Sequence, residues 1–185
     1  MNYSLELHKV ENTNPASSAW NAVYTRHQHE KTVAGNLNGN DFEVFLPTYT
    51  VVRQWADRKK CISLPLFPSY VFVRGALSRS FRVLTIPGVR SLVSFAGRPA
   101  AIPDSEIDAV RKAVESRFRV EPHPFLRSGD WVRVRFGPLA GLEGILVRKK
   151  QSYQLILSME LLGRSVAVAV DAFSVQPLAL RAPLR

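Results

Sequence analysis

Few residues in this sequence have types and spacing that support catalysis or metal binding. His27 and His29 are two positions apart, which places their imidazoles on different faces of a helix, and no cysteine pair accompanies them, so a metal site is disfavoured. The carboxylates of 104–108 follow a proline and suit a helix N-terminus better than a catalytic pair. Cys61, the single cysteine, lies beside charged residues. Because no Gly-rich phosphate loop or hydrolase motif occurs, we expect a protein that is not an enzyme and uses no cofactor.

The chemistry that the sequence does offer is binding, and it centres on 64–74 (LPLFPSYVFVR). Its two prolines lack backbone donors and suit a sheet edge or the entry to a strand, so we expect a strand to begin at about Ser69. The two-residue period of a strand then places Tyr70 and Phe72 on one face, close to Phe67. These rings give the face more aromatic surface than a strand needs when that face meets only water. Either a helix or a partner must therefore cover that face.

Length, charge and composition limit the class of protein. The 185 residues allow one domain or two smaller ones, and a hydrophobic fraction of 46% is typical of a folded chain. The net charge of +10 favours an anionic partner, most simply nucleic acid or a nucleoprotein machine. No apolar run approaches a membrane span of roughly 18 residues, and the first residues lack the features of a signal peptide. We therefore expect a cytoplasmic protein with no membrane partner.

The first part of the chain predicts an α+β fold, in which a mostly antiparallel sheet has helices against it. After a mobile tail over 1–18, alternation predicts a strand over 19–24. A helix then opens at Thr25 or just after it and ends near Leu37, where residues 38–40 tolerate positive φ. The other predicted elements are a strand over 42–46, a hairpin with arms 49–54 and 61–64 and a charged tip 55–60, a short helix or turn over 81–86, a strand over 91–95 and a turn over 96–99.

Another helix is predicted after Pro103, where early carboxylates favour a helix N-terminus. Its apolar residues recur at steps of three and four and keep to one face. They are Ile107, Val110, Val114 and Phe118. The helix therefore has one side that must be buried.

The last third of the chain predicts a second, smaller domain. Two prolines within 120–127 indicate a stiff linker. The short strands that follow alternate with glycine turns, which is typical of a small SH3-like β-barrel. They span 129–136, 145–149, 154–161, 165–170 and 173–177, and in the first of them Val132, Val134 and Phe136 can face the core. The predicted organisation is a tail (1–18), a domain (19–119), the linker (120–127), the barrel (128–178) and a second tail (179–185).

These motifs, in this order, resemble NusG-type transcription elongation factors. The N-terminal domain of that family is similar in the strand 20–24 before a helix, Phe-Leu-Pro at 45–47, the stretch 65–73, Pro-Gly-Val at 87–89 and Ile-Pro at 102–103. Its C-terminal KOW domain is similar at 129–134, 137–141 and 162–164. The stretch 66–70 is especially similar to the operon-specific RfaH-type members. The resemblance covers about residues 19–178 and implies a transcription elongation and antitermination factor.

The resemblance implies that the N-terminal domain binds the clamp helices of RNA polymerase and reduces pausing or termination. The residues implied in this contact are Tyr24, Phe67, Tyr70, Phe72 and Phe81. A helix laid into an apolar groove is an established mode of recognition, and Tyr is a common interface anchor. The competing interpretation is that these rings are core residues under the helices. For Phe67 and Phe72 it explains the residue type as well as a polymerase contact does. It suits the tyrosines less, because their hydroxyls are better placed at a wet rim. Around Phe81 the sequence departs from the His-Thr-Thr of RfaH-type proteins.

The resemblance also implies contact with the exposed non-template single strand of DNA. The candidates by position and charge are Arg26, His27, His29, Arg79, Arg82 and Arg90. Phosphate contacts together with base stacking would suffice for such a strand. For each of these residues, a solvated basic face is the alternative.

For the KOW domain the resemblance implies an adaptor that binds ribosomal protein S10 or the termination factor Rho. Leu139, Leu142 and Ile145 are the positions implied, although Ile145 is better explained as barrel core. In RfaH this domain can refold into helices, whereas the alternating valines of 166–170 favour strands here. We expect a monomer.

Two other classes of function compete with this interpretation. A ribosome-associated or general RNA-binding protein could use the small barrel, without any need for the aromatic cluster and with steep salt dependence. An enzyme with a site between the two domains would require a deep polar pocket and a perturbed ionisable group there.

Overall fold

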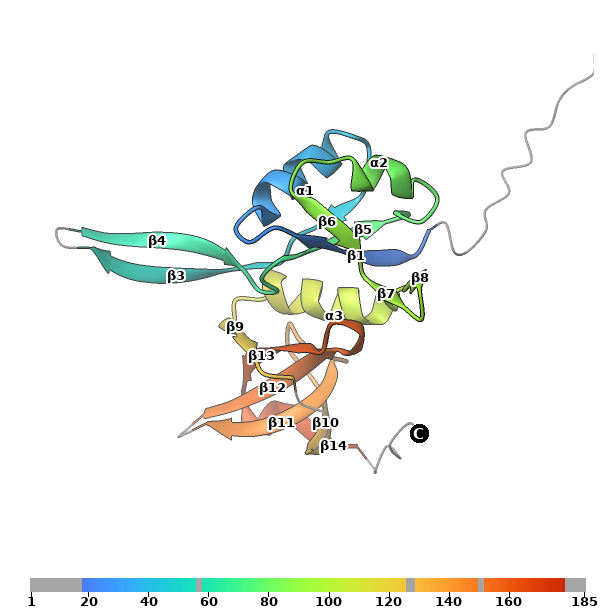
Figure 1. Cartoon of the computed structure of the whole chain (residues 1–185). Coiled ribbons are helices and arrows are strands. Elements are labelled where there is room, and N and C mark those ends of the chain that lie inside the picture. The colour runs from blue at the N-terminus through green and yellow to red at the C-terminus, as the bar shows by residue number, and fades with distance from the viewer. Residues whose placement is uncertain (1–17, 56–57, 126–128, 150–151, 179–185) are drawn as a thin grey trace, which may run out of the picture.

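The computed structural model describes residues 18–55, 58–125, 129–149 and 152–178. The predicted tails lie outside these residues, apart from Ser18, as do 56–57 of the hairpin tip, 126–127 of the predicted linker and 128 at the start of the predicted barrel. Within the described residues, no helix is long and apolar enough to cross a membrane. Figure 1 shows an N-terminal region and a C-terminal sheet, with one helix lying between them.

The N-terminal region is built on a four-stranded antiparallel sheet in the order β2-β5-β1-β6. Its elements are β1 (Trp20–Thr25), α1 (Glu30–Asn38), β2 (Val44–Phe45), β3 (Thr48–Trp55), β4 (Arg58–Pro65), β5 (Tyr70–Arg74), α2 (Ser80–Leu84), β6 (Val89–Leu92), β7 (Ser94–Phe95), β8 (Arg98–Pro99) and α3 (Asp104–Glu115). The α+β fold predicted from the sequence is confirmed.

The alternation of β5 divides the core of this region into two faces. Val71 and Val73 are buried with Val33 of α1 and Val83 of α2. Phe72, on the opposite face, is buried in the cluster that contains helix α3. Figure 1 accordingly shows α1 and α2 on one side of the sheet and α3 on the other.

Strands β3 and β4 form the predicted hairpin, which projects from the side of the sheet (Figure 1). Its pairing runs from Thr48 opposite Pro65 to Trp55 opposite Arg58. The base is anchored, because Leu66 donates a backbone hydrogen bond to the Pro47 carbonyl at 2.9 Å. Every described residue from Val52 to Cys61 is exposed.

The predicted start of the first helix was wrong, whereas its end at Asn38 agrees with the predicted end near Leu37. Thr25 is the last residue of β1, and Gln28 adopts a left-handed φ of 63°, so the turn between them delays the helix to Glu30. At the other end Gly39 keeps a helical φ of −65°, and the left-handed residue is Asp41 at 59°. The left-handed residue therefore lies one position beyond the predicted 38–40.

The region after α2 also differs in detail from the prediction. The strand expected over 91–95 is interrupted at Val93, so that β6 belongs to the main sheet whereas β7 pairs with β8 in a separate hairpin. Helix α3 ends at Glu115, where Ser116 becomes extended, and Phe118 consequently lies beyond the helix and is exposed. Ala113 is buried on the helix instead.

The C-terminal region is a single antiparallel sheet in the order β14-β10-β11-β12-β13-β9. Its elements are β9 (Val120–His123), β10 (Asp130–Val134), β11 (Glu143–Lys149), β12 (Ser152–Met159), η2 (Glu160–Leu162), β13 (Arg164–Val170), η3 (Ala172–Ser174) and β14 (Val175–Pro177). Residues 120–123, predicted to be linker, thus pair with β13 as an edge strand. Phe136 lies beyond the end of β10 and is exposed, contrary to its predicted core position.

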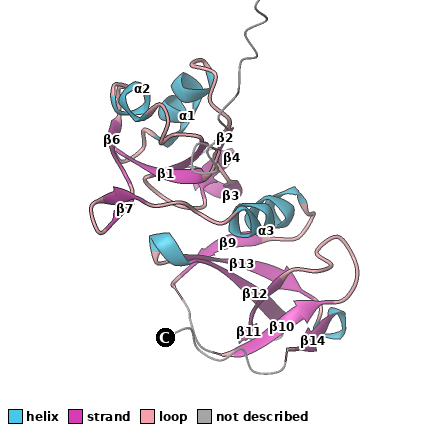
Figure 2. Cartoon of the chain, turned by 90° about the vertical axis from the view of Figure 1, so that its right-hand side faces the viewer, coloured by secondary structure: helices cyan, strands magenta, loops and turns pink. Residues whose placement is uncertain are grey.

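Helix α3 joins the two regions. One buried cluster extends from Trp20 and Phe72 of the N-terminal sheet, through Val110 of α3, to Leu155 of the C-terminal sheet. Figure 2 shows α3 lying between the two layers, close to β9 and β13. Of the apolar stripe predicted for this helix, Ile107 and Val110 are buried and Val114 is partly buried in this cluster, whereas Phe118 is not part of it.

Candidate functional site

The turn before β5 fixes the position of Tyr70. Ser69 adopts a left-handed φ of 68°, and its amide donates to Glu30 Oε1 at 2.7 Å. The Ser69 carbonyl accepts from the Thr25 amide at 2.9 Å, and the Tyr70 amide donates to the Phe67 carbonyl at 3.1 Å. Glu30 is buried at the start of α1, so its carboxylate ties the turn to α1, while the bond from Thr25 ties it to β1.

Tyr24 and Tyr70 form an exposed aromatic pair. They lie directly opposite each other in the β1–β5 ladder, with ring centroids 5.5 Å apart and planes tilted by 47°. Tyr24 is 38% exposed and Tyr70 is half-buried. Both line a hollow of about 360 Å³, which Arg164 of β13 also lines. The C-terminal sheet thus approaches the tyrosine pair.

Phe67 and Phe72 belong to the buried cluster against which Tyr70 packs. Their rings meet edge to face with centroids 5.5 Å apart, and both side chains are almost fully buried. Phe45 packs next to Phe72 at a centroid distance of 6.1 Å. In this arrangement, Phe67 and Phe72 support the surface on which Tyr24 and Tyr70 are accessible.

Phe81 is not part of the same surface. It lies on α2 and is 78% exposed, whereas the neighbouring Val83 packs into the cluster on the α1 and α2 side of the sheet. Tyr24 and Tyr70 belong to the other face. The structure therefore separates Phe81 from the four other aromatic residues of the predicted contact.

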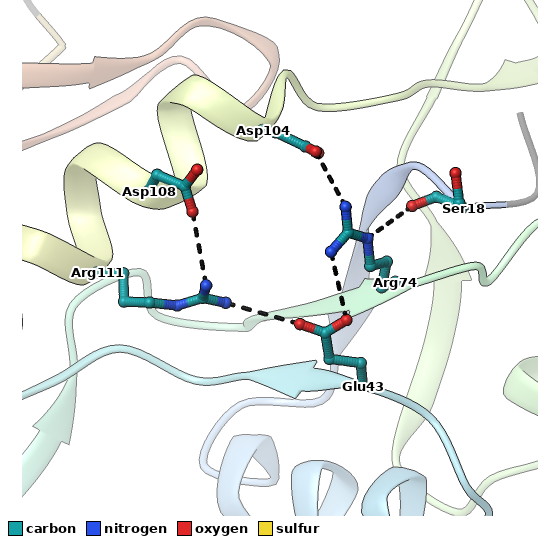
Figure 3. Close-up of polar contacts among 6 residues, drawn as sticks. All are labelled: Ser18, Glu43, Arg74, Asp104, Asp108 and Arg111. Atoms are coloured by element: carbon teal, nitrogen blue, oxygen red, sulfur yellow. Dashed lines mark hydrogen bonds and ion pairs between the residues drawn. The ribbon is translucent and has the colours of Figure 1, made fainter. Parts of the chain in front are cut away.

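Ion pairs hold α3 to the N-terminal sheet (Figure 3). Arg74 of β5 contacts Asp104 at 3.0 Å and Glu43 at 3.5 Å, and its Nε donates to the Ser18 carbonyl at 2.8 Å. Arg111 of α3 reaches Glu43 at 3.8 Å. Its guanidinium also lies 5.7 Å from the Trp20 ring centroid, so charge and aromatic contacts combine here.

The other side of α3 contacts the C-terminal sheet. Lys112 donates from Nζ to the Ala140 carbonyl, and the backbone of Glu160 donates to the Glu106 carboxylate. Burial, with a smaller contribution from the nearby charge of Glu160, raises the pKa of Glu106 to about 6. Its Oε2 has no hydrogen-bond partner among the described residues. Glu106 is not among the residues that line the hollow beside the tyrosines. The hollow and the carboxyl with the raised pKa are therefore separate features.

The predicted nucleic-acid residues fall into two groups. Arg79 and Arg82 converge on Phe42, with guanidinium carbons 4.0 and 5.9 Å from its ring centroid. Arg79 also donates to the carbonyl of residue 41, and Arg82 to the carbonyl of residue 40. Both cations therefore already have partners within the protein.

The second group surrounds the turn between β1 and α1. Arg26, His27 and His29 are exposed on this turn. The Arg26 amide donates to the Gly88 carbonyl at 2.8 Å, which brings the turn beside the exposed Arg90 of β6. Within the described residues, no group of three or more His, Cys, Asp or Glu could hold a metal ion.

The residues predicted to bind a KOW partner are buried. Leu139 and Leu142 belong to the cluster that includes α3, and Ile145 packs with Ile156 and Ala167 in a separate one. Ile145 is thus a core residue, as the alternative interpretation held. Sequence reasoning missed Arg164 and the Arg74–Arg111 network, because neither has a local motif and both depend on how distant elements meet.

A comparison with protein families shows which family the chain belongs to. Residues 18–111 match the family model described as "Transcription termination factor nusG". This match covers the four-stranded sheet, the tyrosine pair and most of α3. The chain belongs to the NusG family of transcription termination factors.

Individual relatives agree with this assignment. The transcription termination/antitermination protein NusG of Escherichia coli is 27% identical over 139 residues, which span 72% of this chain and 77% of the relative. The protein of the same description from Vibrio cholerae is 28% identical over 141 residues, 74% of this chain and 78% of the relative. A solved structure described as "Domain interaction in Thermotoga maritima NusG" has a TM-score of 0.52 at 22% identity and covers 88% of this chain and 98% of that one. The last similarity concerns the fold alone.

Proposed function

We propose that this protein is an elongation and antitermination factor that binds RNA polymerase through its N-terminal region and reduces pausing or termination. The observation that carries the proposal is the Tyr24–Tyr70 pair, which stays accessible on the face of a NusG-family domain that α3 covers in part. Tyrosine is favoured at interfaces because it combines a large apolar ring with a polar hydroxyl. The clamp helices of the polymerase are the proposed ligand of this face.

The proposed contact extends from the tyrosines toward residues that are now covered. Arg164 lines the hollow beside Tyr24 and Tyr70, so a helix of the polymerase would meet the C-terminal sheet as well as the tyrosines. Phe67 and Phe72 would be reached only if α3 or the C-terminal sheet moved. While they are buried, their role is to form the core against which Tyr70 packs.

The remaining partners follow from the same proposal. Arg26, His27, His29 and Arg90 form a basic turn suited to the phosphates of the non-template strand. Arg79, Arg82 and Phe81 would form a second contact surface on α2. In the C-terminal region, Leu139 and Leu142 would bind ribosomal protein S10 or Rho only after leaving the buried cluster. The RfaH-type specialisation stays a prediction.

A ribosome-associated or RNA-binding role is the second candidate. The net charge of +10 supports it, since such charge favours any polyanion. Unlike polymerase binding, RNA binding should weaken steeply as the salt concentration rises and should not require the tyrosine pair.

The test is binding of the full chain to bacterial core RNA polymerase, with Tyr24→Ala/Tyr70→Ala as the double variant. Phe173→Ala is the matched control, because Phe173 is also an exposed aromatic residue but lies on η3 of the C-terminal region. We expect the double variant to weaken binding at least about tenfold, since interface anchors contribute roughly 2 kcal/mol or more. Equal binding of the double variant and the control would exclude the tyrosine face, whereas a native chain that does not bind the polymerase would leave ribosome binding as the leading candidate.

A further inference from the structure

The outer half of the β3–β4 hairpin carries a concentrated set of cations on one side. Residues directly opposite each other in an antiparallel pair project to the same face. Arg53 is opposite Lys60, and Trp55 is opposite Arg58. Because these positions alternate along the strands, all four side chains share one face. We call these four residues the Trp55 face.

The reverse side of the hairpin has a different composition. Val52 lies opposite Cys61 and Gln54 opposite Lys59, so this side bears a single cation and no aromatic ring. We call these residues the Lys59 face. Lys59 and Lys60 are adjacent in sequence, equally charged and both exposed, but they lie on opposite faces.

The Trp55 face has no partner within the described part of the chain. Trp55 is 56% exposed, and Arg53, Arg58 and Lys60 are exposed and make none of the ion pairs among the described residues. Like charges directly opposite each other, as in the Arg53–Lys60 pair, destabilise a two-stranded sheet. An anionic ligand would relieve that repulsion.

The hairpin holds this face away from the body of the protein. Its base is tied to α1 by Lys31, whose Nζ donates to the Ser63 carbonyl at 2.8 Å. Tyr49 near the base packs against the main core cluster. Strands of eight residues extend about 25 Å at roughly 3.3 Å per residue, so the tip can reach a ligand that the sheet does not touch.

We infer that the Trp55 face is a binding site for single-stranded nucleic acid, separate from the tyrosine pair and from the basic residues of the β1–α1 turn and α2. Arg53, Arg58 and Lys60 would contact successive phosphates, and the Trp55 indole would stack on one base. Aromatic rings flanked by cations are the usual means by which proteins hold single strands without reading their sequence. The inference does not depend on polymerase binding.

The residues of this face favour a single strand over a duplex. Bases in a duplex are already stacked on one another, whereas a single strand presents free ring surfaces to an exposed indole. The face has no hydroxyl or amide side chain that could read a base edge or a ribose 2′-hydroxyl, because Gln54 lies on the reverse side. We therefore expect similar affinity for DNA and RNA single strands.

The first experiment exploits the adjacent lysines. Binding of fluorescent oligo-dT and oligo-U to the full chain is measured by anisotropy at several salt concentrations, for Lys60→Gln and for its control Lys59→Gln. Each change removes one charge from the same hairpin, so general electrostatic attraction falls equally in both. Lys60→Gln alone should reduce the slope of log affinity against log salt by about 0.7, the loss of one phosphate contact on a single strand.

The second experiment tests stacking. Trp55→Ala should weaken binding of both oligonucleotides about fivefold or more, because stacking of one base contributes roughly 1–3 kcal/mol. Trp55→Phe keeps an aromatic ring and should restore most of the loss. Binding of a duplex of the same length should change little in either variant.

Two results would overturn the inference. Equal effects of Lys59→Gln and Lys60→Gln would show that only diffuse charge acts. Unchanged oligonucleotide binding by Trp55→Ala, or an equal loss of duplex binding, would exclude stacking on a single strand. Because these side chains are exposed and outside the core, matched circular dichroism and melting curves suffice to exclude misfolding.

Discussion

Glu106 of helix α3 accepts a backbone hydrogen bond from Glu160 across the junction between the two regions. The contact places a partly buried carboxyl beside a second acidic side chain. Burial, the main cause, raises the pKa of Glu106 from 4.5 to about 6. One of its oxygens, Oε2, has no partner within the described residues. The junction is therefore easier to form when Glu106 is protonated.

The junction should weaken as the pH rises. Below pH 4.5 Glu106 is protonated in both the packed and the unpacked states, whereas above about pH 6 it is charged in both and the packed state bears the desolvation cost. The stabilising contribution is thus present at low pH and lost between pH 4.5 and about 6. Its size is on the order of 1 kcal/mol after screening by solvent. Unfolding midpoints measured between pH 4.5 and 7.5 test this.

Glu106→Gln should flatten this part of the pH profile. Glu115→Gln is the control, because Glu115 is exposed at the other end of the same helix. If both variants keep the slope of the native chain over this range, Glu106 does not titrate in the junction as described.

Arg111 should stabilise the packing of α3 by more than its ion pairs alone. Its contacts with Glu43 and Asp108 are partly exposed, and such pairs contribute about 0.2–1 kcal/mol each. Stacking over Trp20 and Phe45 adds a cation–π contribution. We expect Arg111→Ala to lower the free energy of unfolding by about 1–2 kcal/mol, measured by urea titration.

Arg111→Lys should recover only part of that loss, since an ammonium keeps the charge but not the planar stacking of a guanidinium. Arg117→Ala is the control, because Arg117 is exposed just beyond the end of α3. An Arg111→Ala variant as stable as Arg117→Ala would mean that the network contributes nothing measurable.

The strand pattern was predictable because it is local. Alternation in β5 alone places Tyr70 and Phe72 on one face, and the structure has them there. Their different burial was not predictable, since it depends on how α3, a helix distant in sequence, packs on this face. The sequence left open whether Phe67 and Phe72 lie at the surface or in the core. In the structure both are buried in the cluster that includes α3.

Strand β9 is an element that the sequence analysis predicted wrongly, as a linker. Pro122 and Pro124 suggested a linker, because proline cannot donate to a sheet ladder. Strand β9 lies at the edge of its sheet, however, where the missing donor of Pro122 can face away from β13 at little cost. Composition alone does not distinguish an edge strand from a linker when both contain proline.

Gly144 should be essential to the C-terminal sheet for a steric reason. A Cβ atom at this position would lie 2.4 Å from the Ile156 carbonyl oxygen on the neighbouring strand. Since that atom belongs to the backbone, the β11–β12 ladder would have to distort. We expect Gly144→Ala to destabilise the protein by roughly 2–4 kcal/mol, the range of severe packing defects.

Gly163 provides the comparison for this prediction. Its φ is +55°, but a Cβ there meets no atom of the described residues within 4 Å. Gly163→Ala should therefore cost only the left-handed conformation, about 1 kcal/mol. Thermal melts of the two variants would contradict the steric argument if they showed the same destabilisation.

Stability measurements should separate the supporting rings from the proposed binding rings. Phe72→Ala removes an almost fully buried side chain and should lower the free energy of unfolding by about 3–5 kcal/mol. Tyr24→Ala should lower it by about 1 kcal/mol or less, because that ring is 38% exposed. If polymerase binding is then measured under conditions where both variants are folded, Tyr24→Ala should show the larger loss. The reverse order would indicate that Phe72 becomes accessible in the bound state, and that α3 or the C-terminal sheet moves to expose it.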